Sequence, residues 1–133
     1  MLYAILCYND ENVVSTWSQE EDDACMARLM EVQSGMSEKG KLGPVVRLWN
    51  TDEARTLKKT NGDPVVFDGP FAETKEQFLG FYVADCADMD EALDFARELA
   101  KANPGTGSYE IRPLRYFGDN KLARTEMLGV AAE

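Results

Sequence analysis

Asp68 is the side chain whose type and setting best suit acid–base chemistry in this sequence. It follows the β-branched run Val65-Val66 and opens the turn Asp68-Gly69-Pro70. Gly69 supplies backbone freedom and Pro70 fixes φ, so the chain can reverse here. The carboxylate of Asp68 can brace this turn by accepting backbone hydrogen bonds, or it can lie in a cleft as a general acid or base. The residue types alone favour the brace, because aspartate before glycine is a common turn device.

Other catalytic chemistry is restricted by what the sequence lacks. It contains no histidine, which excludes His-dependent triads, imidazole proton shuttles and imidazole metal ligands. Its three cysteines, Cys7, Cys25 and Cys86, are widely separated and form no Cys-x-x-Cys pair. We therefore expect small buried side chains in a reducing, cytoplasmic compartment and no metal site. No Gly-rich phosphate loop or nucleophile elbow occurs, so we expect no cofactor.

The charge of the chain limits its partners. The 133 residues include 24 acidic and 14 basic side chains, for a net charge of −10. Nucleic acids and anionic membrane surfaces both require clustered positive charge, so neither is an expected partner. The apolar start, residues 1–7, has no basic segment or cleavage site and reads as a buried strand instead of a signal peptide.

The hydrophobic pattern predicts elements that would hold Asp68 on a small α+β sandwich. A strand over residues 2–8 precedes a helix capped by Ser18 that ends near Glu38. A second helix begins after Asp88 and ends before Asn103. The remaining expected strands cover residues 45–49, 53–59, 64–67, 78–84 and 109–114, with an Asn61-Gly62 type I′ turn in the hairpin and a bulge or close approach at Gly80.

This order of elements predicts a ferredoxin-like βαββαβ sandwich with an extra β-hairpin. Two helices can cover only one face of the sheet, yet the strands over residues 2–8 and 78–83 are apolar on both faces. A two-fold homodimer that buries the second face is the economical solution. The alternative is that the C-terminal tail covers it.

The nine residues Asp68-Gly69-Pro70-Phe71-Ala72-Glu73-Thr74-Lys75-Glu76 closely resemble the signature of the YCII-related family, in its DGPF branch. The resemblance implies one domain over residues 1–117, followed by a tail over residues 118–133. The residue pattern of the tail, apart from the resemblance, predicts a weak helix over residues 121–130. The resemblance also implies a dimeric α+β barrel whose clefts lie beside the sheets. The family is mostly uncharacterised, so no reaction is implied directly.

An Asp–His pair has been proposed as the acid–base site of YCII-like relatives, and Asp68 is the candidate for its acidic member. Cys25 stands where compact relatives carry the histidine, and its inward helical spacing is more typical of a core residue than of a nucleophile. The mechanism of those relatives therefore cannot be transferred intact.

The other candidate site residues would bind substrate. They are Gly69, Pro70 and Phe71 of the signature, Tyr82 on the strand that follows it, and Lys58, a basic residue on the preceding hairpin for which Arg55 is the alternative. Solvated strand faces and core packing explain the same residues more simply.

Two functions follow from the resemblance. The first is an isomerase-like or lyase-like acid–base enzyme that acts on a small organic acid. The second is a non-catalytic binding or regulatory module, for example a partner of an extracytoplasmic-function sigma factor, whose genes often lie beside those of DGPF-like proteins. An acidic dimer could dock on a basic protein surface.

Overall fold

The computed structural model of the chain describes residues 1–120 and 122. The elements follow one another as β1 (Leu2–Asn9), α1 (Glu11–Ser15), α2 (Gln19–Glu38), β2 (Leu42–Arg47), a 3₁₀ turn (Thr51–Glu53), β3 (Arg55–Lys58), β4 (Val65–Asp68), β5 (Gln77–Asp85), α3 (Met89–Ala102) and β6 (Ser108–Pro113). The helix expected over residues 121–130 falls, apart from Leu122, outside the described residues.

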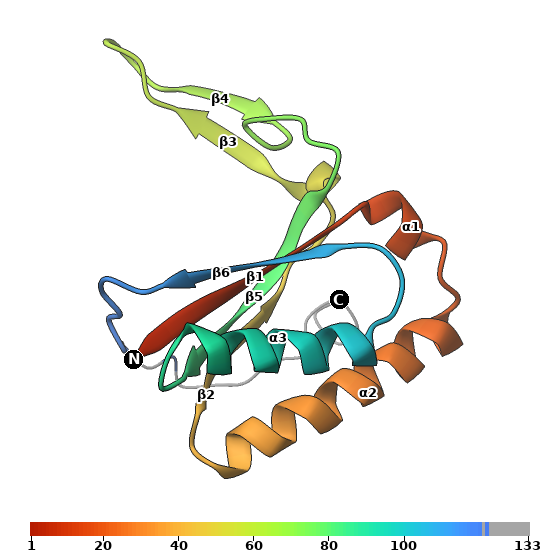
Figure 1. Cartoon of the computed structure of the whole chain (residues 1–133). Coiled ribbons are helices and arrows are strands. Elements are labelled where there is room, and N and C mark those ends of the chain that lie inside the picture. The colour runs from red at the N-terminus through yellow and green to blue at the C-terminus, as the bar shows by residue number, and fades with distance from the viewer. Residues whose placement is uncertain (121, 123–133) are drawn as a thin grey trace.

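A four-stranded antiparallel sheet in the order β2-β5-β1-β6 forms the centre of the fold. Helices α2 and α3 lie together on one of its faces, and β3 and β4 form a separate hairpin that projects away from the sheet (Figure 1). This arrangement confirms the predicted ferredoxin-like α+β sandwich with an extra hairpin. We call residues 55–68 the arm.

The core lies between the helices and the sheet. Ile5 on β1 and Leu99 on α3 are fully buried, and Tyr82 of β5 packs against Phe95 of α3 with the ring centroids 5.8 Å apart. Burial of such side chains stabilises the fold by about 1.5–3 kcal/mol each. The expected core role of Cys25 is also confirmed, because it is buried with this cluster.

Both long helices begin as predicted. Ser18 Oγ accepts a hydrogen bond from Glu21 N at 3.0 Å, and Ser18 N donates to Glu21 Oε1 at 3.2 Å, which completes a capping box. Asp88 Oδ1 accepts from Glu91 N at 2.9 Å at the start of α3.

Three details of the predicted strands and loops were wrong. The residues after β1, for which no helix was predicted, form the short helix α1, and its N-cap residue Asp10 accepts a hydrogen bond from Asn12 N through Oδ1 at 2.9 Å. Strand β2 begins at Leu42, not Val45, because Gly43 has no side chain and passes close to the backbone of β5. A Cβ on Gly43 would lie 3.1 Å from Val83 O.

The turn at the tip of the arm is the third difference. It is not a two-residue type I′ turn, because β3 ends at Lys58, β4 starts at Val65, and Gly62 does not adopt a positive φ. Thr60 organises this longer loop instead: its hydroxyl donates to Asp63 O at 2.7 Å and accepts from Gly62 N at 3.1 Å. A local side-chain hydrogen bond has therefore replaced the tight turn.

The bulge expected at Gly80 is present. The pairing of β1 with β5 passes from Cys7–Gly80 to Tyr8–Phe78, which leaves Leu79 without a partner. A Cβ on Gly80 would overlap Val46 O and lie 3.0 Å from Val46 C, so only glycine fits against β2. Strand β5 extends from the sheet toward the arm (Figure 1).

Candidate functional site

The signature turn lies where the arm joins the rest of the chain. Arg55 and Asp68 form the first pair of the hairpin, with Arg55 Nε 3.0 Å from Asp68 Oδ1. Gly69 follows with a φ of +91°, donates its N–H to Ala54 O at 2.8 Å, and accepts from Thr56 Oγ1 at 2.8 Å. The carboxylate of Asp68 therefore holds the two strands together at the base of the arm, while backbone and hydroxyl groups secure the turn.

The Asp68 side chain is open to water on the single chain. It is 88% exposed, and Phe71, two residues beyond Gly69, is 86% exposed. A general acid or base usually works in a site that excludes water. Within one chain the described residues give Asp68 an ion pair with Arg55 but leave its carboxylate without a surrounding wall.

The structure separates the two basic residues that the sequence offered as substrate ligands. Directly paired residues of a hairpin share a face, so Arg55, Leu57, Val66 and Asp68 project from one side. Lys58 pairs with Val65 on the opposite side, nearer the tip. Arg55, not Lys58, is therefore the basic side chain that can act together with Asp68.

Tyr82 lies apart from this turn, in the core beneath the helices. It is 7% exposed, and its hydroxyl accepts a hydrogen bond from Gln33 Nε2 of α2 at 3.2 Å. Burial raises the pKa of its phenol, which the neighbouring Cys7 thiol raises further. Of the predicted site residues, those that lie together at the base of the arm are the consecutive residues Asp68, Gly69, Pro70 and Phe71. Lys58 and Tyr82 lie elsewhere.

Gln33 is a buried polar residue that sequence reasoning missed. It follows the buried Leu29 by four positions, so helical spacing places it on the inward stripe of α2. Because glutamine is polar, the sequence pattern did not predict that this position is buried. The signal that could have predicted a buried polar partner was Tyr82, a tyrosine on a buried strand, since a buried hydroxyl needs a hydrogen-bond partner.

Aromatic side chains gather on the face of the sheet that points away from α2 and α3, which we call the distal face. The ring of Phe78 lies 5.5 Å from that of Tyr8 and 6.4 Å from that of Phe81. Leu6 and Val46 pair with Phe81 on this face, and the Tyr8 hydroxyl donates to Glu110 Oε1 at 3.4 Å. An apolar wall of this kind suits the body of a small organic ligand.

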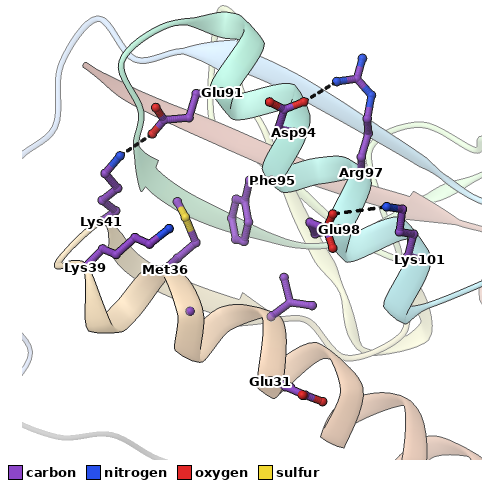
Figure 2. A pocket seen from close by; sticks show the side chains of 12 residues that line it. Glu31, Met36, Lys39, Lys41, Glu91, Asp94, Phe95, Arg97, Glu98 and Lys101 are labelled. Atoms are coloured by element: carbon purple, nitrogen blue, oxygen red, sulfur yellow. Dashed lines mark hydrogen bonds and ion pairs between the residues drawn. The ribbon is translucent and has the colours of Figure 1, made fainter.

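A groove of about 760 Å³ lies between α2 and α3 (Figure 2). Met36 and Phe95 contribute apolar surface to it. The charges around it are largely paired: Lys41 Nζ lies 2.6 Å from Glu91 Oε1, and two further ion pairs follow along α3. The hydrogen bond with Lys41 lowers the pKa of Glu91. Because most charged side chains of this groove are held in ion pairs, the groove is a poor candidate for a catalytic site.

A smaller hollow of about 270 Å³ lies against Trp17, Cys25 and Arg28. The Cys25 thiol lies 3.3 Å from Asn103 Oδ1, and burial raises its pKa although Arg28 acts in the opposite direction. Arg28 Nε donates to Ala102 O at 2.7 Å, at the end of α3. Since the thiolate is the reactive form, Cys25 is poorly suited to act as a nucleophile.

Neither hollow includes a residue of the arm. Within the described ranges, no group of three or more His, Cys, Asp or Glu side chains is placed to hold a metal ion. No helix there is long and apolar enough to cross a membrane. Among the described residues, the signature turn and the distal aromatic wall are thus the features best suited to bind or act on a ligand.

Comparison with known proteins agrees with the resemblance of the signature. The model of the YCII-related domain family matches residues 1–117. The chain is also similar to an uncharacterised protein, R00369, of Rhizobium meliloti (strain 1021), with 61% identity over 122 residues that span 92% of this chain and 98% of that protein.

Proposed function

Because the chain belongs to the YCII-related family, we propose that it is a homodimeric enzyme of the isomerase or lyase kind, which binds a small organic acid between two copies and uses Asp68 for acid–base catalysis. One observation carries the proposal. The Asp68–Arg55 pair lies at the base of an arm whose large apolar side chains are exposed on the single chain. Such a site lacks a second wall, and another copy of the chain would supply it.

The proposed chemistry uses the two charged side chains in different roles. Arg55 would bind the substrate carboxylate, since guanidinium holds two carboxylate oxygens in a fixed geometry. In doing so the substrate would replace Asp68 as the partner of Arg55 and release the Asp68 carboxylate. Asp68 would then take a proton from a substrate carbon and return it to another carbon, or assist the loss of a leaving group. With no histidine in the sequence, one carboxyl group would make both transfers.

The second candidate is a non-catalytic binding or regulatory module, for example a partner of an extracytoplasmic-function sigma factor. The exposure of Asp68 and the absence of histidine favour this alternative. A net charge of −10 would also attract a basic protein surface. Both candidates would work in the cytoplasm, where the three free cysteines stay reduced.

Turnover measurements separate these functions. Wild type, Asp68→Asn and Asp63→Asn are tested on a panel of cyclic lactones and unsaturated dicarboxylic acids, with sedimentation analysis of each protein. For an enzyme we expect turnover by wild type, a loss of about 10²-fold or more in Asp68→Asn, and little change in Asp63→Asn, which alters an acidic side chain near the tip of the same arm. A wild type inert toward the whole panel, together with sigma-factor binding that Asp68→Asn leaves intact, would establish the regulatory alternative instead.

A further inference from the structure

The arm leaves apolar side chains uncovered on both of its faces. Leu57 and Val66, on the face of Asp68, are 60% and 64% exposed. Val65 and Phe67, on the opposite face, are also exposed. A two-stranded hairpin is at best marginally stable alone in water, so this one needs a packing partner to hold its shape.

The exposed area suits a protein partner of ordinary size. Trp49, Leu57, Val65, Val66, Phe67 and Phe71 together expose on the order of 600 Å², compared with the roughly 800 Å² that one side of a standard protein interface buries. Leu6, Tyr8 and Phe81 of the distal face would add to this area. The arm, with Trp49 and Phe71 that flank it in the sequence, and the distal face are therefore large enough to form one interface together.

A second copy of the same chain matches the charge of the arm. On the Asp68 face of β3 the arm carries the basic side chain of Arg55, on a chain of net charge −10. Acidic groups border the distal face: Glu110 accepts from Tyr8, and Glu76 Oε1 accepts from Ser108 Oγ at 2.8 Å. Each arm would thus bring the Arg55 guanidinium to an acidic edge of its partner.

We infer that the arm acts in trans: it crosses to the partner, and its Asp68 face packs over the partner's distal face. The inference rests on the proposed homodimer and specifies how its site is built. Asp68 and Arg55 of one chain would form the polar wall of each cleft, and the aromatic set of Tyr8, Phe78 and Phe81 in the other chain would form the apolar wall. The ligand class is then a small carboxylate with an apolar body, and two equivalent clefts form per dimer.

Cysteine cross-linking between differently tagged chains tests this arrangement. One chain carries Val66→Cys on the arm and the other carries Tyr8→Cys on the distal face; they are co-expressed, purified through both tags and treated with a short bismaleimide. We expect a cross-linked heterodimer in at least tenfold greater yield than from a control pair of Val66→Cys with Arg97→Cys, which lies on α3. A second pair, Leu57→Cys with Phe78→Cys, serves if either first variant fails to fold by circular dichroism.

The outcomes separate the inference from the proposed function. A dimer by sedimentation with cross-linking at the control level for the folded test pair would overturn the arm arrangement and leave the dimer intact. A monomer would overturn both. Cross-linking within a single chain that carries both Val66→Cys and Tyr8→Cys, in preference to cross-linking between chains, would show that the arm folds back on its own sheet and would also reject the inference.

Discussion

Replacing Tyr82 with phenylalanine would distinguish a core role for this residue from a role in ligand binding. Tyr82 and Gln33 are both buried, and the amide of Gln33 donates to the Tyr82 hydroxyl at 3.2 Å. Tyr82→Phe keeps the ring against Phe95 and leaves the amide N–H without this acceptor. A buried donor without a partner costs about 1–3 kcal/mol, so we expect a loss of about 1–2 kcal/mol in the free energy of unfolding.

Urea denaturation at fixed protein concentration measures this loss, since stability of an oligomer depends on concentration. With a denaturant slope of about 2 kcal/mol/M, the midpoint should fall by about 0.5–1 M. The double variant Gln33→Leu, Tyr82→Phe should recover part of the loss, because both polar groups are then absent. Tyr116→Phe is the matched control, since Tyr116 is exposed. An unchanged midpoint in Tyr82→Phe, combined with weaker binding of a substrate, would refute the core assignment.

Two further predictions concern Gly80 in the sheet and the partly buried side chains of Cys7 and Tyr109. Gly80→Ala should destabilise the fold by about 1–3 kcal/mol or prevent folding, as measured by thermal melting, because its Cβ would overlap the backbone of Val46. Gly35→Ala on α2, where an added Cβ meets nothing, is the control and should be neutral or stabilising. Equal effects of the two substitutions on the melting temperature would contradict this explanation. Burial raises the pKa of the Cys7 thiol and of the Tyr109 phenol to about 12. The unfolded chain releases these protons near pH 9 and pH 10, so these two groups should leave the urea midpoint unchanged between about pH 7 and pH 8 and lower it as pH rises from there toward 12. Tyr109→Phe should make the fall shallower, and a midpoint that stays level to pH 11.5 would show that these groups do not titrate differently on unfolding.

The fold was predictable because local signals and long-range pattern agreed. Ser18 and Asp88 each occupy a helix N-cap, and the apolar stripes behind them face the sheet as their spacing predicts. Gly80, inside the strand after the signature, predicted a bulge or a close approach by another group. The structure has a bulge there, and the backbone of Val46 approaches Gly80 closely. Where propensity competed with a local hydrogen bond, as at Thr60, the sequence pattern was misleading.

The candidate site was less predictable, because its parts depend on strand register and on which face of the sheet each residue occupies. Strand alternation already puts Arg55 and Lys58 on opposite faces of the arm, but only the pairing of Arg55 with Asp68 shows which of the two lies beside the carboxylate. Tyr82 follows the signature closely in sequence but turns toward the helices, whereas Phe81 beside it turns away. A shift of one residue in register would exchange these two positions.

The placement of β1 has a consequence for how the chain is made. Among the strands of this sheet β1 is synthesised first, yet its two neighbours in the sheet, β5 and β6, belong to the last elements of the domain. Such long-range pairing slows folding into the range of milliseconds to seconds. A ribosome must therefore release nearly the whole domain before β1 is paired on both sides, and until then its unpaired backbone can associate with other nascent chains.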